Sequence, residues 1–232
     1  MVNPLTQNLQ RAKTVIIVFY AIILCYAVSC VSLWLQISML EKLDVNNLNM
    51  EELRANDMRQ ISIAYTLIAI IIVSIVTFIM WFRRAYYNLQ QAGQFTDFSE
   101  GWAAGAWFVP FLNLVRPYKI MVEIWEKTQF AVPQFINNRS SQIVGIWWAA
   151  YITSNIVANI AYRFGGDMDS TIKDLISGSR IQIGSNVLRI VTAIITVIMV
   201  RQVSEMEEAL YHNINAEYIE DKESVLGFVG DV

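Results

Sequence analysis

Four long runs of apolar residues divide the chain, and each is long enough to cross a lipid bilayer. They cover residues 15–35, 61–82, 143–162 and 183–200. A membrane-spanning helix needs about 20 predominantly apolar residues, because the hydrocarbon core is roughly 30 Å thick and a helix rises about 1.5 Å per residue. The pattern therefore predicts four transmembrane helices.

The first apolar run follows Arg11 and Lys13, which is also how the apolar part of a signal peptide begins. The run is longer than the roughly 7–15 residues of such a segment, and no good small-residue cleavage site follows it. We therefore expect a retained transmembrane helix at this end of the chain.

Polar segments at residues 36–60 and 163–182 connect the runs into two hairpins. In the first segment, Asn49 precedes Glu52 by three residues, which is a helix-starting pattern. We expect a short amphipathic helix there.

The central stretch at residues 101–125 begins as an apolar run and then breaks. Gly101–Val109 would make about 14 Å of helix, half a bilayer at most. Pro110 disfavours helix at the residue before it, and Pro117 suits the first turn of a new helix. We therefore expect a helical hairpin over residues 101–127 that is either re-entrant or interfacial, with its second helix lying along the membrane surface.

The positions of lysine and arginine test this topology. If the central stretch does not cross, ten of these residues lie on the N-terminal side and six on the other. If it crosses once, the counts become seven and nine. Cytoplasmic loops are enriched in positive charge, so the first arrangement is favoured. We expect a plasma-membrane protein, in a bacterium the inner membrane, with both termini cytoplasmic.

The fold class that follows is all-α, with four transmembrane helices and the central hairpin. We expect residues 1–205 to form a single integral membrane domain. Residues 206–232 read as an acidic amphipathic cytoplasmic tail, with apolar positions such as Met206 and Leu210 at helical spacing. Such a helix is either a solvated extension of the fourth span or a docking segment for a protein partner.

Composition narrows the function. The chain is 55% hydrophobic and 16% charged, with a net charge of −3, so no basic surface indicates nucleic acid. Cys25 and Cys30 lie in an apolar run, where we expect them to be small buried side chains. His212 is the only histidine. No metal-ligand spacing and no catalytic motif is present. We expect a non-catalytic protein without a cofactor or a bound metal.

A specific motif carries a family resemblance. WFRRAYYNL at 81–89 is followed by the pattern W-x2-G-x-W-F-x-P-x2-N-x3-P and then I-W within 101–125. The residues that meet the pattern are Trp102, Gly105, Trp107, Phe108, Pro110, Asn113, Pro117, Ile124 and Trp125. Over roughly residues 15–205 the chain resembles a bacterial multi-pass membrane family catalogued as domain of unknown function 4328. The resemblance implies an integral membrane protein with no established activity, and it supplies no catalytic residues.

The charged residues near the central hairpin are candidate lipid or partner contacts. Arg83 and Arg84 are typical of residues that fix the orientation of a membrane-spanning helix. The alternative is that they form a pocket for anionic lipid together with Arg116 and Lys119. Glu123 is either an intramembrane carboxylate or a surface residue paired with Lys119 or Lys127.

Other candidates are polar or aromatic residues near the membrane. We expect Trp102 and Trp125 to lie at the membrane–water interface. We expect the Asn113 side chain to cap or brace the polar turn by hydrogen bonds to its backbone. Within the spans, Asn155, Asn159 and Arg189 suit polar packing between helices, with a solute path or gating as the alternative.

Besides an unusual enzyme that uses Glu123, which no catalytic motif supports, two functions remain open. The first is an interaction or accessory subunit that docks to other membrane components, with a protein partner or a second copy. The second is a small transporter, channel or lipid-binding protein that uses a groove beside the 101–127 hairpin.

Overall fold

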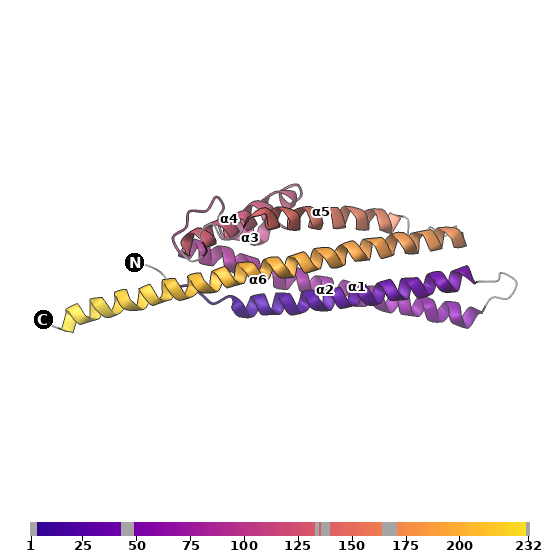
Figure 1. Ribbon diagram of the computed structural model, residues 1–232, viewed down its shortest axis with the longest axis horizontal. Coiled ribbons are helices and arrows are strands. Elements are labelled where there is room, and N and C mark those ends of the chain that lie inside the picture. Colours follow the sequence, from indigo (N-terminus) through magenta and orange to yellow (C-terminus); the bar gives the residue numbers. More distant parts are fainter. Residues whose placement is uncertain (1–3, 43–48, 133–134, 136–139, 164–170, 231–232) are drawn as a thin grey trace. The chain divides into compact units, whose positions relative to one another are not determined.

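The computed structural model describes residues 4–42, 49–132, 135, 140–163 and 171–230, and most of these residues are helical. Figure 1 shows the elements in chain order. They are α1 (Leu9–Glu41), α2 (Met50–Gln91), α3 (Gly101–Gly105), the 3-10 helix η1 (Leu112–Leu114), α4 (Arg116–Ala131), α5 (Gln142–Arg163) and α6 (Ile172–Gly230). The predicted all-α fold class is confirmed.

The four predicted transmembrane helices are confirmed as α1, α2, α5 and α6, each of which carries an apolar stretch long enough to cross a membrane. Three of them are longer than a bilayer requires. α6 has 59 residues, or roughly 90 Å, so only part of it fits within hydrocarbon. We take the apolar runs as the spans, so that α2 leaves the membrane after Phe82 and α6 after Val200.

Two predicted boundaries are corrected. The short helix expected near Asn49 is the beginning of α2, which continues unbroken to Gln91. Asn49 does cap it, because its Oδ1 accepts the backbone N–H groups of Glu51 and Glu52 at 3.2 and 3.3 Å. α6 runs past residue 205 without a break. Parts of the two expected loops, residues 43–48 and 164–170, lie outside the described residues.

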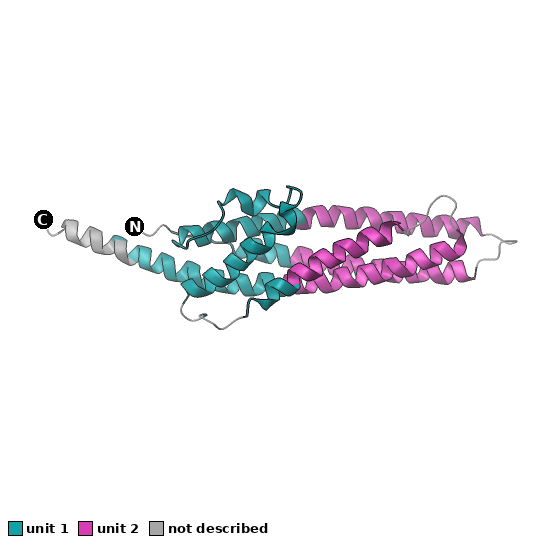
Figure 2. Cartoon of the chain, turned by 90° about the horizontal axis from the view of Figure 1, so that it is seen from above, with its two compact units in different colours: residues 1–16, 75–146, 198–232 teal, residues 17–74, 147–197 magenta. Residues whose placement is uncertain are grey.

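The chain divides into two compact units, shown in Figure 2. Unit 1 comprises residues 1–16, 75–146 and 198–232, and unit 2 comprises residues 17–74 and 147–197. Unit 1 thus combines the three segments that the lysine and arginine count assigns to one side of the membrane.

In unit 2 the buried side chains join α1, α2 and α6. Ile22 and Tyr26 of α1 pack with Ala193 of α6, and apolar residues of all three helices surround them. Polar groups between the helices bond one another: Asn186 donates to Ser29 Oγ at 3.0 Å. Within the membrane such groups require internal partners.

In unit 1, a buried cluster consists of Leu5, Val132 and Leu210. Leu5 belongs to the N-terminal segment, Val132 directly follows α4, and Leu210 belongs to α6. Met206 is buried as well. Met206 and Leu210, two of the apolar positions expected to dock a partner, are therefore already covered by this protein itself. The tail's face is apolar because it completes the core of unit 1.

The central hairpin exists, but its first helix is shorter than predicted. α3 ends at Gly105 instead of Val109, and hydrogen bonds of the i→i+3 type follow it, such as Phe108 N–H to Gly105 O at 3.1 Å. Phe111 has a φ of 64°, which ends any regular helix there. Pro117 lies in the first turn of α4, as predicted.

The second hairpin helix is packed into the protein, while its position along the membrane surface stays a prediction. Half of the 16 residues of α4 are buried, including Ile120, Ile124 and the polar residues Glu123 and Gln129. The helix can be buried on more than one side because its buried polar residues form hydrogen bonds within this protein.

Candidate functional site

A cationic pocket of about 390 Å³ lies in unit 1 and is named here the arginine pocket. Its lining residues are Arg11, Met80, Arg83, Arg84, Tyr87 and Glu100. Three guanidinium groups and one carboxylate give it a net charge of +2. Its volume lies within the range of about 300–1,000 Å³ that is usual for small-molecule sites.

The helices place these arginines where two spans leave the membrane. Arg83 and Arg84 directly follow the apolar run that ends at Phe82, and Arg11 lies four residues before the run that begins at Val15. All three arginines therefore lie just outside the apolar runs, at positions where such side chains usually reach the lipid headgroups. Nη1 of Arg11 lies 3.5 Å from the carbonyl of Met80, which brings α1 and α2 together around the pocket.

The electrostatics of the pocket favour an anion. Partial burial lowers the pKa of Arg11, and the neighbouring positive charge of Arg84 lowers it further, with Glu207 acting in the opposite direction. The guanidinium of Arg84 lies 5.3 Å from the ring centre of Tyr87. Clustered guanidinium groups are a common recognition element for phosphate, because each offers a planar set of donors.

Glu100 neutralises one of the three arginines. Nε and Nη2 of Arg83 lie 2.8 and 2.7 Å from the same oxygen, Oε1 of Glu100. The side chain of Arg83 is 57% exposed, so solvent weakens this ion pair. Arg11 and Arg84 have no such ion pair within the described residues, which leaves them as the stronger anion ligands.

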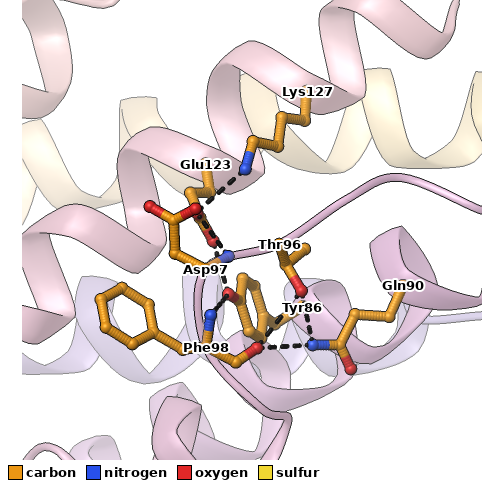
Figure 3. A network of polar contacts seen from close by, with 7 residues as sticks. All are labelled: Tyr86, Gln90, Thr96, Asp97, Phe98, Glu123 and Lys127. Carbon is orange, nitrogen blue, oxygen red and sulfur yellow. Dashed lines mark hydrogen bonds and ion pairs between the residues drawn. The ribbon is translucent and has the colours of Figure 1, made fainter.

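A buried carboxylate positions the loop that carries Glu100. Figure 3 shows Glu123 of α4 facing α2 and the 94–100 loop. Glu123 accepts a short hydrogen bond from the Tyr86 hydroxyl and further bonds from Asp97 N–H at 3.0 Å and Lys127 Nζ at 2.9 Å. Because Glu123 is 7% exposed, these three donors are what make its burial tolerable.

Tyr86 connects the same loop to α2. Its hydroxyl oxygen accepts the Phe98 N–H at 3.2 Å while donating to Glu123. Burial raises the pKa of Tyr86, and the hydrogen bond to Glu123 raises it further, so the hydroxyl stays protonated. Gln90 adds a bond from its amide to the Phe98 carbonyl at 2.9 Å. The network fixes the loop and, through it, the counter-ion of Arg83.

A second buried carboxylate lies on α6, seven residues beyond the end of the fourth span. Oε1 of Glu207 accepts a hydrogen bond from the amide of Asn88 at 2.7 Å, and Oε2 accepts one from Asn8 at 2.9 Å. Burial raises the pKa of Glu207 to about 7, although both amides and the charges of Arg84 and Arg11 oppose the shift. This carboxyl therefore interacts with two arginines of the pocket.

A known protein family matches most of the chain. A protein-family model described as Domain of unknown function (DUF4328) matches residues 44–205. The chain belongs to the DUF4328 family. No curated protein and no solved structure matches the chain. Arg83, Arg84 and Glu100 lie within the matched region of this DUF4328 protein, whereas Arg11 and Glu207 lie outside it.

The arginine pocket of this DUF4328 protein differs from the one expected. Arg116 does not line it and stacks on Trp102 instead, with its guanidinium 3.8 Å from the ring centre. One terminal nitrogen of Arg116 is buried and has no hydrogen-bond acceptor among the described residues. Lys119 is exposed and does not line the pocket either. The stacking on Trp102 holds Arg116 away from the pocket arginines, and the position of α4 does the same for Lys119.

Three other predicted residues of the hairpin are placed as follows. Glu123 pairs with Lys127, as one of the two predictions had it, but it is buried and not on the surface. Trp125 is fully buried instead of interfacial. The α4 N-cap is Val115 and has no side-chain hydrogen bond, so Asn113 does not cap that helix.

Within the spans, Asn155 and Asn159 face outward. Each amide donates to the carbonyl four residues earlier on α5, at 2.8 and 3.3 Å. The expected bond to a neighbouring helix is therefore not formed in the described part, since the helix's own carbonyls satisfy the amides. Arg189 points to α1, where its Nη1 lies 3.1 Å from the Tyr26 hydroxyl.

Sequence reasoning missed several residues of the site. Arg11 was read as a flank of the first span, and Glu100, Tyr86 and Glu207 were not singled out. Chain distance explains this, because Glu207 lies 199 residues from Asn8. One usable signal existed: Glu207 lies on the apolar stripe of α6, next to Met206, where a carboxylate requires partners.

Proposed function

We propose that this DUF4328 protein is a non-catalytic membrane protein that binds the anionic headgroup of a lipid in the arginine pocket. The observation that carries the proposal is the convergence of Arg11, Arg83 and Arg84 on one pocket where two spans end. Anionic lipids are attracted to basic groups at this depth. Met80 and Tyr87 offer an apolar wall beside the charges, as a lipid with a charged head and an apolar body requires.

The test is lipid binding by the purified protein. Native mass spectrometry or a competition assay would compare phosphatidylglycerol, which is anionic, with phosphatidylcholine, which has no net charge. We expect preferential retention of phosphatidylglycerol and about tenfold weaker binding by Arg84→Ala, because a charge-assisted hydrogen bond contributes roughly 1.5–3 kcal/mol.

Lys13→Ala is the matched control, since Lys13 is exposed near the same membrane surface but does not line the pocket. Equal losses in Arg84→Ala and Lys13→Ala would show that binding is non-specific attraction to the basic surface. Inorganic phosphate as a competitor distinguishes the possible sources of the anion: displacement of the lipid by millimolar phosphate would indicate a free anion as the ligand.

We further propose that both termini and the central hairpin are cytoplasmic, in a plasma membrane. Phe95→Cys and Phe130→Cys, in a background without Cys25 and Cys30, provide the test because both phenylalanines are exposed. A membrane-impermeant maleimide should label both positions from the cytoplasmic side alone. Labelling of the two positions from opposite sides would overturn this topology.

Docking to another membrane component is the second candidate. It is favoured by the outward position of Asn155 and Asn159 on a span, because an amide that meets hydrocarbon gains from an amide partner on another helix. The partner is either another protein or a second copy. A stoichiometric complex purified in mild detergent and lost on Asn155→Leu with Asn159→Leu would support docking. A lone monomer in both samples would refute it.

A further inference from the structure

The Glu207 site is a small cavity in unit 1 at the point where the N-terminal segment, α2 and α6 meet. Its volume is about 10 Å³, close to the lower limit for one water molecule. The polar side chains of Asn8, Asn88, Ser204 and Glu207 line it. Asn8 is 4% exposed and Ser204 is 7% exposed, so the polar groups at the base of the site are largely shielded from bulk water.

The hydrogen bonds at this site leave acceptors without a donor. Both oxygens of Glu207 accept bonds from asparagine amides, and the second amide bond of Asn8 goes to the Trp81 carbonyl at 3.2 Å. Oδ1 of Asn8 and Oγ of Ser204 are buried and have no partner among the described residues. Buried polar atoms are rarely left unpaired, so a donor is missing. A protonated Glu207 would supply this donor through a single water molecule in the cavity, since the Ser204 hydroxyl makes no direct hydrogen bond to the carboxylate in the described structure.

The charges around Glu207 connect it to the arginine pocket. The ionisable groups that face it in the described residues are Arg11 from α1, Arg84 from α2, and Glu208 and Tyr211 from α6 itself. The N-terminal segment contributes Thr6 and Gln7, which carry no charge. Arg11 and Arg84 also line the anion site. A charge change at one site is therefore felt at the other through the same two guanidinium groups.

We propose that Glu207 is a proton-binding site whose occupancy is coupled to anion binding in the arginine pocket. Protonation converts the carboxylate to a neutral carboxyl with a proton from water, and thereby removes the negative charge that competes for Arg11 and Arg84. An anion in the pocket neutralises the same guanidinium groups and favours the protonated form. By linkage the two effects are equal, so anion binding takes up a proton and anion affinity rises as the pH falls. The coupling rests on the proposed lipid site, whereas proton binding at Glu207 does not.

The first measurement concerns the proton alone. Infrared difference spectra of the full chain in detergent, recorded across pH 4 to 9, should show a carboxyl C=O band that titrates near pH 7 and is absent in Glu207→Gln. The band should persist in Glu208→Gln, a neighbouring carboxylate that accepts no amide bond in the described structure. Ser204→Ala removes one acceptor for the proton and should shift the titration to lower pH. A band that titrates near the ordinary value of a glutamate, about 4.5, or that survives in Glu207→Gln, would overturn proton binding.

The second measurement concerns the coupling. Short-chain phosphatidylglycerol is the probe, because its phosphodiester keeps one charge throughout this pH range. Its affinity should rise about tenfold from pH 8.5 to pH 5.5 in the unaltered protein and stay constant in Glu207→Gln, within the usual range of coupling between sites. Equal pH dependence in both proteins would overturn the coupling and leave the lipid site intact. Absence of binding at both pH values would refute the lipid site and the coupling with it, while the infrared band still decides proton binding.

Discussion

Removal of the Glu123 carboxylate should release the loop that holds Glu100. In Glu123→Ala, the Tyr86 hydroxyl and the Asp97 N–H both lose their acceptor, and Lys127 loses its ion pair. The substitution also creates a cavity between α4, α2 and the loop. We expect the variant to fold but with a less stable unit 1 and a looser arginine pocket.

The expected loss is about 3–5 kcal/mol in the free energy of unfolding. Hydrogen bonds to a charged group contribute roughly 1.5–3 kcal/mol each, and a buried donor left without a partner costs about 1–3 kcal/mol. The ion pair with Lys127 adds little, since that side chain is 30% exposed. Glu123→Gln keeps the shape and part of the hydrogen bonding, so we expect it to lose about half as much.

Two assays on the purified protein check this magnitude. Unfolding in mild detergent with added SDS gives the change in stability, and hydrogen–deuterium exchange reports the loop through the amides of Asp97 and Phe98. Glu126→Gln is the control, because Glu126 is the exposed carboxylate on the same helix, and it should change stability by less than about 0.5 kcal/mol. If Glu123→Ala loses less than about 1 kcal/mol and the Asp97 amide exchanges as in the control, the reasoning about this network is refuted.

Three further predictions concern the pocket, the pH response and the end of α2. Glu100→Gln frees Arg83 and should tighten phosphatidylglycerol binding by between about 1.5- and fivefold, as measured by competition, since a partly exposed ion pair contributes roughly 0.2–1 kcal/mol; weaker binding would contradict this. The raised pKa of Glu207, about 7, means that folding favours the protonated carboxyl, so stability should be highest below about pH 4.5 and fall by about 3 kcal/mol as the pH rises through 7. In Glu207→Gln, the unfolding free energy measured as a function of pH should no longer show that fall. The same pH dependence in the variant would refute the raised pKa of Glu207. Gly93→Ala should cost about 1–2 kcal/mol of unfolding free energy, because Gly93 has a φ of +75° with open space around it, while Gly93→Asn should cost less; equal losses would show that backbone conformation is not the cause.

The sequence predicts the membrane architecture well because each span is a local property. A run such as residues 61–82 needs only its own length and composition to be recognised. Pro117 likewise marks the first turn of α4 by its own backbone chemistry. The turn that follows α2 is equally local, although it was not predicted: Gln94 N–H bonds the Leu89 carbonyl, and Gly93 supplies the positive φ.

The site was harder to predict because its residues meet only in three dimensions. Glu123 could be judged from α4 alone as a surface partner of Lys127, yet Tyr86 and the 94–100 loop bury it from the other side. Arg11 joins Arg84 only through the packing of α1 on α2. The stripe at Met206 and Leu210 has the period of an amphipathic helix, and that period does not tell whether a partner or the protein itself covers it.

The measurement that tests the lipid-binding proposal most directly is an experimental structure of the protein in phosphatidylglycerol-containing nanodiscs. The proposal predicts a lipid phosphate within hydrogen-bond distance of Arg11 and Arg84, with its acyl chains toward the apolar surface beside Met80. A pocket that holds only water, while ordered phosphatidylglycerol occupies other surfaces of the same particle, would contradict it.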